Sequence, residues 1–119
     1  LEMKKPQYRL TDHSSTVLDD IYFRSLNQWG EAVATKYVAS LYAAMAEAAA
    51  HPDAGKRRFE RSKPYLMIPA ERHFVVYDRI GGDVVILDFQ HQSRDIENVI
   101  AQLMPAFQQE IDDIKAAVP

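Results

Sequence analysis

Six polar side chains suited to proton or phosphate chemistry lie on two neighbouring extended runs. The end of the last run carries His91, Arg94 and Asp95, and the run before it carries Arg72, His73 and Tyr77. A histidine and a tyrosine can transfer protons, and arginines can stabilise charge that develops on a phosphate. The four side chains that would suit general acid–base cleavage of RNA are Arg72, Tyr77, His91 and Arg94.

A structural interpretation competes with this catalytic one. His91 can hydrogen-bond across a sheet, and Tyr77 can belong to a core. Arg94 can pair with the neighbouring Asp95. Clusters of this kind are common, and a sequence does not reveal perturbed pKa values. We therefore favour the structural roles and expect a binding protein in preference to an enzyme.

Several other kinds of chemistry lack their motifs. The chain has no cysteine, which excludes disulfides, thiolate catalysis and cysteine-based zinc sites. Gly81 and Gly82 form an isolated pair with no phosphate-binding loop around them, and no Gly-x-Ser-x-Gly motif occurs. No two histidines stand three or four residues apart, so we expect no helical metal site and no cofactor. The histidines are His13, His51, His73 and His91.

Length and composition indicate one globular domain, residues 1–119, with an apolar content of 47%. Leu1 and Glu2 precede Met3, and we interpret them as an added remnant. No apolar run approaches a membrane span and no signal peptide is visible, so we expect a cytoplasmic protein.

Charge is unevenly distributed along the chain. Residues 1–54 carry −2, residues 55–94 carry +3 and residues 95–119 carry −4, for a net charge of −3. A protein that binds nucleic acid without a partner protein usually has a larger excess of basic residues. We therefore expect this chain to bind a protein partner. The most basic segment, residues 56–63, is interpreted as a solvated loop, with a binding edge for an acidic partner as the alternative.

The first half of the chain predicts a short strand and a helix hairpin. The strand is Tyr8–Leu10. A helix over about Asp12–Trp29 would be capped by Thr11, and Gly30 would end it. One face of this helix would carry Leu18, Ile21, Tyr22, Ser25 and Trp29. A second helix follows over about Glu31–His51, and the alanines between Ala43 and Ala50 favour helix formation. Its apolar stripe would be Val33, Tyr37, Leu41 and Met45.

The second half predicts a sheet followed by a helical tail. Three extended runs cover Tyr65–Ile68, His73–Arg79 and Val84–His91, and the last two are apolar enough to be covered on both faces. The Gly-Gly pair suits a tight hairpin between them. In the tail, Pro105 predicts a kink or a break in a helix that carries one apolar stripe. The stripe is Ile96, Ile100, Leu103, Phe107, Ile111, Ile114 and Val118. The fold class is α+β, in the order β-α-α-β-β-β with a mainly antiparallel sheet.

This order of elements and motifs resembles the RelE/ParE superfamily of bacterial toxins over about Tyr8 to Ile96. The matching residues are Tyr8-Arg9-Leu10-Thr11, Leu18-Asp19-Asp20-Ile21-Tyr22, Trp29-Gly30, Ala34, Tyr37, His51-Pro52, Gly55, Pro69, Arg72 to Tyr77, Ile86-Leu87 and His91 to Ile96. Trp29-Gly30 and the His91-x-x-Arg94-Asp95 ending are similar to the ParE branch. The RNA-cutting branch usually has an arginine where this chain has Leu66, and a tyrosine after the position of His91.

The resemblance implies a toxin of a type II toxin–antitoxin module that inhibits DNA gyrase. It also implies a ParD-like antitoxin that covers a groove between the helix hairpin and the sheet. The residues we expect to bind the antitoxin are Leu18, Tyr22, Trp29, Tyr37, Arg57, Arg58 and Arg61.

Two alternative functions stay open on sequence alone. One is a ribosome-dependent mRNA interferase of the RelE type, which would use the four side chains named first. The other is an inactive interaction module of the same fold. Both a homodimer and a toxin–antitoxin hetero-oligomer are compatible with the sequence. The tail, residues 96–119, extends past the resemblance; we expect it to pack on the body or on a second copy, or to occupy part of the antitoxin groove.

Overall fold

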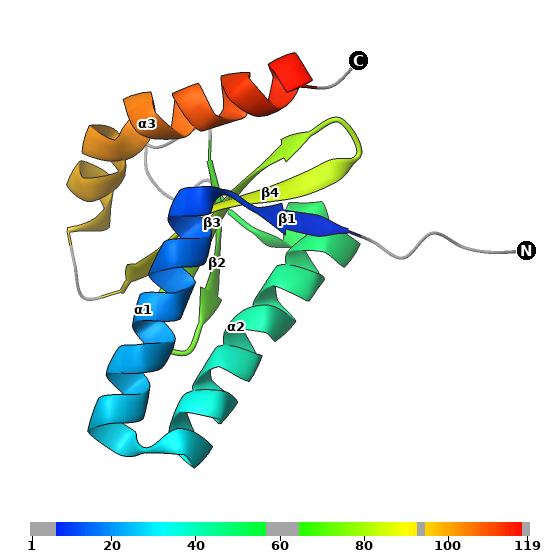
Figure 1. Ribbon diagram of the computed structural model, residues 1–119. Helices are drawn as coiled ribbons and strands as arrows, with labels where there is room; N and C mark the ends of the chain where they lie inside the picture. The colour runs from blue at the N-terminus through cyan, green and yellow to red at the C-terminus, as the bar shows by residue number, and fades with distance from the viewer. Residues whose placement is uncertain (1–6, 57–64, 93–94, 118–119) are drawn as a thin grey trace, which may run out of the picture.

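A computed structural model describes residues 7–56, 65–92 and 95–117 (Figure 1). Its elements are β1 (Tyr8–Leu10), α1 (Asp12–Trp29), α2 (Glu31–Ala50), a short 3-10 turn η1 (Pro52–Ala54), β2 (Leu66–Ala70), β3 (His73–Ile80), β4 (Asp83–His91) and α3 (Ile96–Ala117). The predicted α+β order is confirmed, and the tail forms one long helix. No helix in the described ranges is long and apolar enough to cross a membrane.

The helix hairpin begins and ends where its capping residues predict. The Thr11 side chain accepts a hydrogen bond from the Ser14 N–H at 3.1 Å, which satisfies one free donor of the first turn of α1. Ser14 is buried, and its hydroxyl donates to the carbonyl of Ile86 at 2.9 Å. Gly30 takes a φ of 89° between the two helices, a backbone conformation that side chains disfavour. The start of α1 is therefore fixed directly to β4.

The sheet has the strand order β1-β4-β3-β2, with β1 parallel to β4 and the other pairs antiparallel. The predicted tight turn at Gly81-Gly82 is confirmed, because Ile80 pairs with Asp83 across it. A bulge interrupts the β3–β4 register: Val76 pairs with Asp88, whereas its neighbour Tyr77 pairs with Ile86. One extra β4 residue therefore stands at the bulge and shifts the alternation of the side chains that follow.

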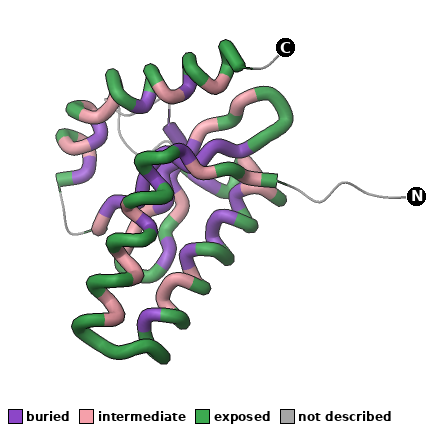
Figure 2. The backbone as a smooth tube through the Cα atoms, viewed as in Figure 1, coloured by how far each residue is buried: buried purple, intermediate pink, exposed green. Residues whose placement is uncertain are grey.

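Both faces of the sheet are covered, as the apolar runs predicted (Figure 2). The helix hairpin packs on one face, and α3 packs on the other. The larger buried side chains on the hairpin face are Leu18, Leu41, Met45, Val75, Tyr77, Ile86 and Phe89. Those on the α3 face are Tyr65, Met67, Val76, Leu87, Ile100, Phe107 and Ile111. The expectation that the tail packs on the body is thus confirmed for residues 96–117, whereas Val118 lies outside the described residues.

Two sequence expectations differ in detail from the structure, and a third had two alternatives. The strand expected at Tyr65–Ile68 continues through Pro69 to Ala70, because β2 is an edge strand that tolerates a residue without an N–H. Of the kink or break predicted at Pro105, the structure has the kink: Pro105 lies inside α3 without ending it, and Figure 1 shows that helix bending between a short first section and a long second one. Trp29 and Val33, expected on apolar faces, are exposed because the hairpin projects beyond the sheet (Figures 1 and 2).

Candidate functional site

A groove of about 780 Å³ runs beside α1 and across the end of the sheet. Its α1 wall is the helical stripe His13, Val17, Asp20, Ile21, Arg24, Ser25 and Gln28. Its sheet wall is Glu71, Arg72, His73, Asp88, Phe89, Gln90 and His91. Trp29, Val33 and Tyr37 from the hairpin and Leu103 from α3 complete it. We call this the α1 groove. At 1.5 Å per residue its α1 wall is roughly 22 Å long, about four helical turns.

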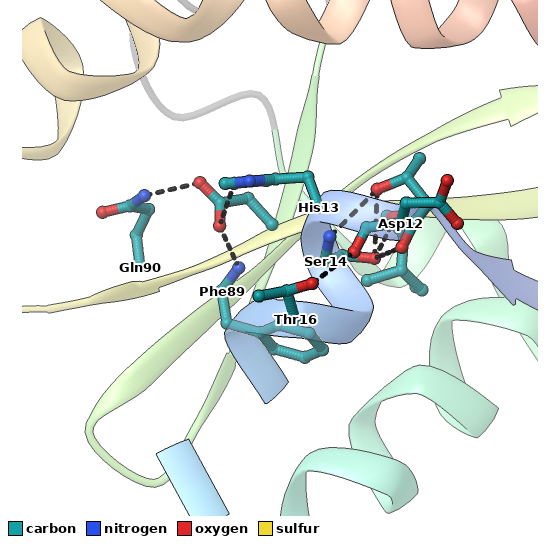
Figure 3. A network of polar contacts seen from close by, with 9 residues as sticks. Asp12, His13, Ser14, Thr16, Phe89 and Gln90 are labelled. Atoms are coloured by element: carbon teal, nitrogen blue, oxygen red, sulfur yellow. Dashed lines mark hydrogen bonds and ion pairs between the residues drawn. The ribbon is translucent and has the colours of Figure 1, made fainter. Parts of the chain in front are cut away.

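A buried carboxylate marks one part of the α1 groove. The Asp88 side chain is 1% exposed. Its three donors come from His13, Phe89 and Gln90, which are labelled in Figure 3. His13 Nε2 lies 3.2 Å from Oδ1, the Phe89 N–H donates to Oδ1 at 2.9 Å, and the Gln90 amide donates to Oδ2 at 2.5 Å. Burial raises the pKa of Asp88, and the hydrogen bond from Gln90 and the nearby His13 oppose that shift. The bulge in β4 explains the placement, because Phe89 turns into the core and Asp88 turns to the other side.

The middle of the groove is held by a tyrosine from α2. The Tyr37 hydroxyl accepts from the Arg72 N–H at 3.2 Å and lies 2.6 Å from His73 Nδ1. Burial raises the pKa of Tyr37, so its hydroxyl stays protonated at neutral pH. The His73 ring contacts the His91 ring edge to face, with centroids 5.1 Å apart. These contacts fix α2 to the turn between β2 and β3.

The far part of the groove offers exposed apolar surface beside paired charges. Trp29 is 61% exposed and Val33 is 48% exposed. On α1, Arg24 pairs with Asp20 at 2.9 Å, one helical turn away. A wall of mixed charge with an exposed indole is typical of a protein-binding surface, where aromatic side chains act as anchors. Among the described residues, no three His, Asp or Glu side chains are placed to hold a metal ion.

Comparison with known proteins places this fold. The family described as the ParE toxin of the type II toxin–antitoxin system, parDE, matches residues 8–96. The chain belongs to the ParE toxin family. It is similar to the toxin ParE1 of Caulobacter vibrioides, with 34% identity over 86 residues that cover 72% of this chain and 88% of that protein.

A solved structure of a chromosomal ParDE system from P. aeruginosa has the same fold as this ParE-family chain. The TM-score is 0.64 at 16% identity, and the match covers 73% of this chain and 96% of that one. The shared fold therefore leaves a substantial part of this chain without a counterpart there. The family match itself ends at Ile96, the first residue of α3.

The structure describes three of the four side chains considered for RNA cleavage, and it does not bring these three together in this ParE-family fold. Arg72 and His91 both line the α1 groove. Tyr77 is fully buried; its hydroxyl donates to the Pro52 carbonyl at 2.7 Å and accepts from the Gly55 N–H at 2.9 Å. Tyr77 also stands four residues along β3 from His73, the partner of His91, a separation of roughly 13 Å. Arg94 lies outside the described residues.

The residues expected to bind an antitoxin fall into four groups. Trp29 and Tyr37 line the α1 groove. Tyr22 is half-buried on α1, beside the ring of Phe23, and does not line the groove. Leu18 is 5% exposed and belongs to the core, so it supports the groove from beneath. Arg57, Arg58 and Arg61 lie outside the described residues.

Sequence reasoning missed the groove residues His13, Asp88 and Gln90. One signal was present: Asp88 is the only charged residue in the apolar run Val84–Phe89. A carboxylate in a buried run needs donors, which pointed to a polar partner from another element. The partner itself, His13 on the first turn of α1, was not readable because 75 residues separate the two.

Proposed function

We propose that this ParE-family toxin arrests growth by binding DNA gyrase, and that a ParD-like antitoxin neutralises it by filling the α1 groove. The claim that an antitoxin fills the α1 groove rests on the length of the groove and on its exposed indole. Its wall is as long as a helix of about four turns, and the exposed Trp29 stands at one part of it. A partner helix laid in such a groove buries apolar side chains at intervals of three and four residues.

Family membership supports the first half of the proposal. The gyrase target comes from the family and not from a feature of the groove. The placement of Tyr77 argues against RNA cleavage by the four side chains named above, because its hydroxyl is engaged with Pro52 and Gly55 inside the fold. A binding inhibitor needs no such catalytic set, so the described geometry favours binding over cleavage.

The gyrase half is tested by a supercoiling assay with purified gyrase, ATP and relaxed plasmid. We expect the chain to abolish supercoiling and to accumulate cleaved plasmid. Prior incubation with the antitoxin encoded beside the gene should restore activity. Complete supercoiling at a large excess of the chain, without cleaved DNA, would remove gyrase as the target.

A second assay separates the binding function from RNA cleavage. The double variant Arg72→Ala, His91→Ala is expressed in cells, and reporter mRNA is mapped for cut sites. We expect no cleavage of the reporter with either the unaltered chain or the variant. Translation-dependent cuts that appear with the unaltered chain and vanish in the variant would establish the interferase instead.

A further inference from the structure

The helix α3 lies beyond the family match and still reaches the α1 groove. Leu103 of α3 lines the groove together with Val17 and Ile21 of α1. Four residues further along α3, the Phe107 ring packs against the ring of His13, with centroids 6.2 Å apart. His13 in turn contacts the buried carboxylate of Asp88. The extension therefore adds an apolar residue to the groove and packs against His13, one of its polar residues.

This wall is rigid because the rest of α3 is anchored in the core. Ile100 and Phe107 are buried against the sheet, one on each side of Leu103 along the helix. Phe107 also makes an edge-to-face contact with Tyr65, with centroids 5.5 Å apart. Leu103 is only half-buried, so part of its side chain remains open to the groove.

We propose that α3 determines which antitoxin the groove accepts, with Leu103 as the residue that contacts it. The proposal rests on the proposed function, in which an antitoxin helix fills the groove. The matching ligand is an antitoxin segment that places an apolar side chain against Leu103, since the Leu103 side chain is itself apolar and partly open to the groove. The family match covers residues 8–96 and so stops before Leu103.

A wall of this kind discriminates by two effects. An antitoxin with an apolar side chain at the contact gains burial, whereas one with a charged side chain there must desolvate that charge against the apolar surface of Leu103. Antitoxins of toxins that lack this wall have not been selected for an apolar side chain at the contact position. Selectivity then comes from an element outside the shared fold.

The test measures the affinity of two antitoxins for this chain by isothermal titration calorimetry. One is encoded beside the gene for this chain, and the other is the antitoxin of the Caulobacter vibrioides relative. For Leu103→Ala we expect roughly tenfold weaker binding of the first antitoxin and no loss for the second. For Leu103→Trp, which fills the groove from the same position, we expect a loss larger than tenfold for the first antitoxin. Gln102→Ala, on the exposed side of α3, is the matched control and should bind like the unaltered chain.

Thermal melting of each variant shows whether the fold is intact. Leu103→Trp should have a melting temperature close to that of the unaltered chain, because the Leu103 side chain that it replaces is half-exposed. If Leu103→Ala and Leu103→Trp both bind the first antitoxin as tightly as the unaltered chain does, the role of α3 is overturned while the proposed function stands. If Leu103→Ala weakens the binding of both antitoxins equally, the claim that α3 determines selectivity is also overturned. If the first antitoxin does not bind the unaltered chain at all, the proposed function fails and this inference fails with it.

Discussion

The Nε2 atom of His13 lies 3.2 Å from Oδ1 of Asp88, and this contact joins the first turn of α1 to the end of β4. Asp88 is almost fully buried, while the His13 side chain is 43% exposed. A carboxylate in this position costs desolvation free energy whenever it is ionised, even with three donors around it. The contact therefore links the geometry of the groove to pH.

The raised pKa of Asp88 predicts a specific pH dependence of stability. The native state holds the Asp88 proton more tightly than the unfolded state, so this group contributes stability below its unfolded pKa of about 3.8. That contribution is lost as pH rises from there through the native pKa. We expect the unaltered chain to lose stability relative to Asp88→Asn over this window. Urea unfolding of both proteins from pH 3 upward measures the difference; a relative gain of stability with rising pH would contradict it.

The hydroxyl of Tyr77 predicts a stability effect without a functional one. Tyr77→Phe leaves the Pro52 carbonyl and the Gly55 N–H without this partner, which should cost about 1–3 kcal/mol of unfolding free energy. Urea unfolding checks the cost. Growth arrest on expression should persist at a temperature where the variant is folded. Loss of toxicity in a fully folded variant would instead assign Tyr77 a functional role.

Burial of the α3 stripe predicts that this helix contributes to the stability of the whole fold. Ile100 is fully buried against the sheet, so Ile100→Ala should lower the unfolding free energy by about 2–5 kcal/mol. Gln102→Ala, two residues away and exposed, should change it by less than about 0.5 kcal/mol. Chemical denaturation of both variants measures this. Equal stabilities would show that α3 does not hold the sheet face.

Local rules were sufficient for much of the fold. Thr11, Gly30 and the Gly81-Gly82 pair each act through the backbone of their immediate neighbours, so the sequence predicted the helix starts and the hairpin turn. The near-continuous apolar run of β4 likewise predicted a strand covered on both faces. The α3 stripe predicted a buried helix, although its partner face could not be named.

The groove was less accessible to sequence reasoning because it depends on contacts between distant residues. The bulge opposite Val76 and Tyr77 decides that Phe89 packs in the hairpin-side core while the buried Asp88 turns to the other side, and no turn residue marks that bulge. Periodicity placed Trp29 on an apolar face of α1. Its exposure follows from how far the hairpin projects past the sheet, which the helix pattern does not specify.

Trp29 gives the most direct measurement of the groove as the antitoxin site. It is the single tryptophan of the chain and is 61% exposed in the α1 groove. The measurement titrates the chain with an antitoxin fragment that carries no tryptophan and follows the emission maximum. We predict a blue shift that saturates at the stoichiometry found by calorimetry, since the indole becomes buried. Saturating binding with no change in Trp29 emission would place the antitoxin elsewhere and contradict the proposal.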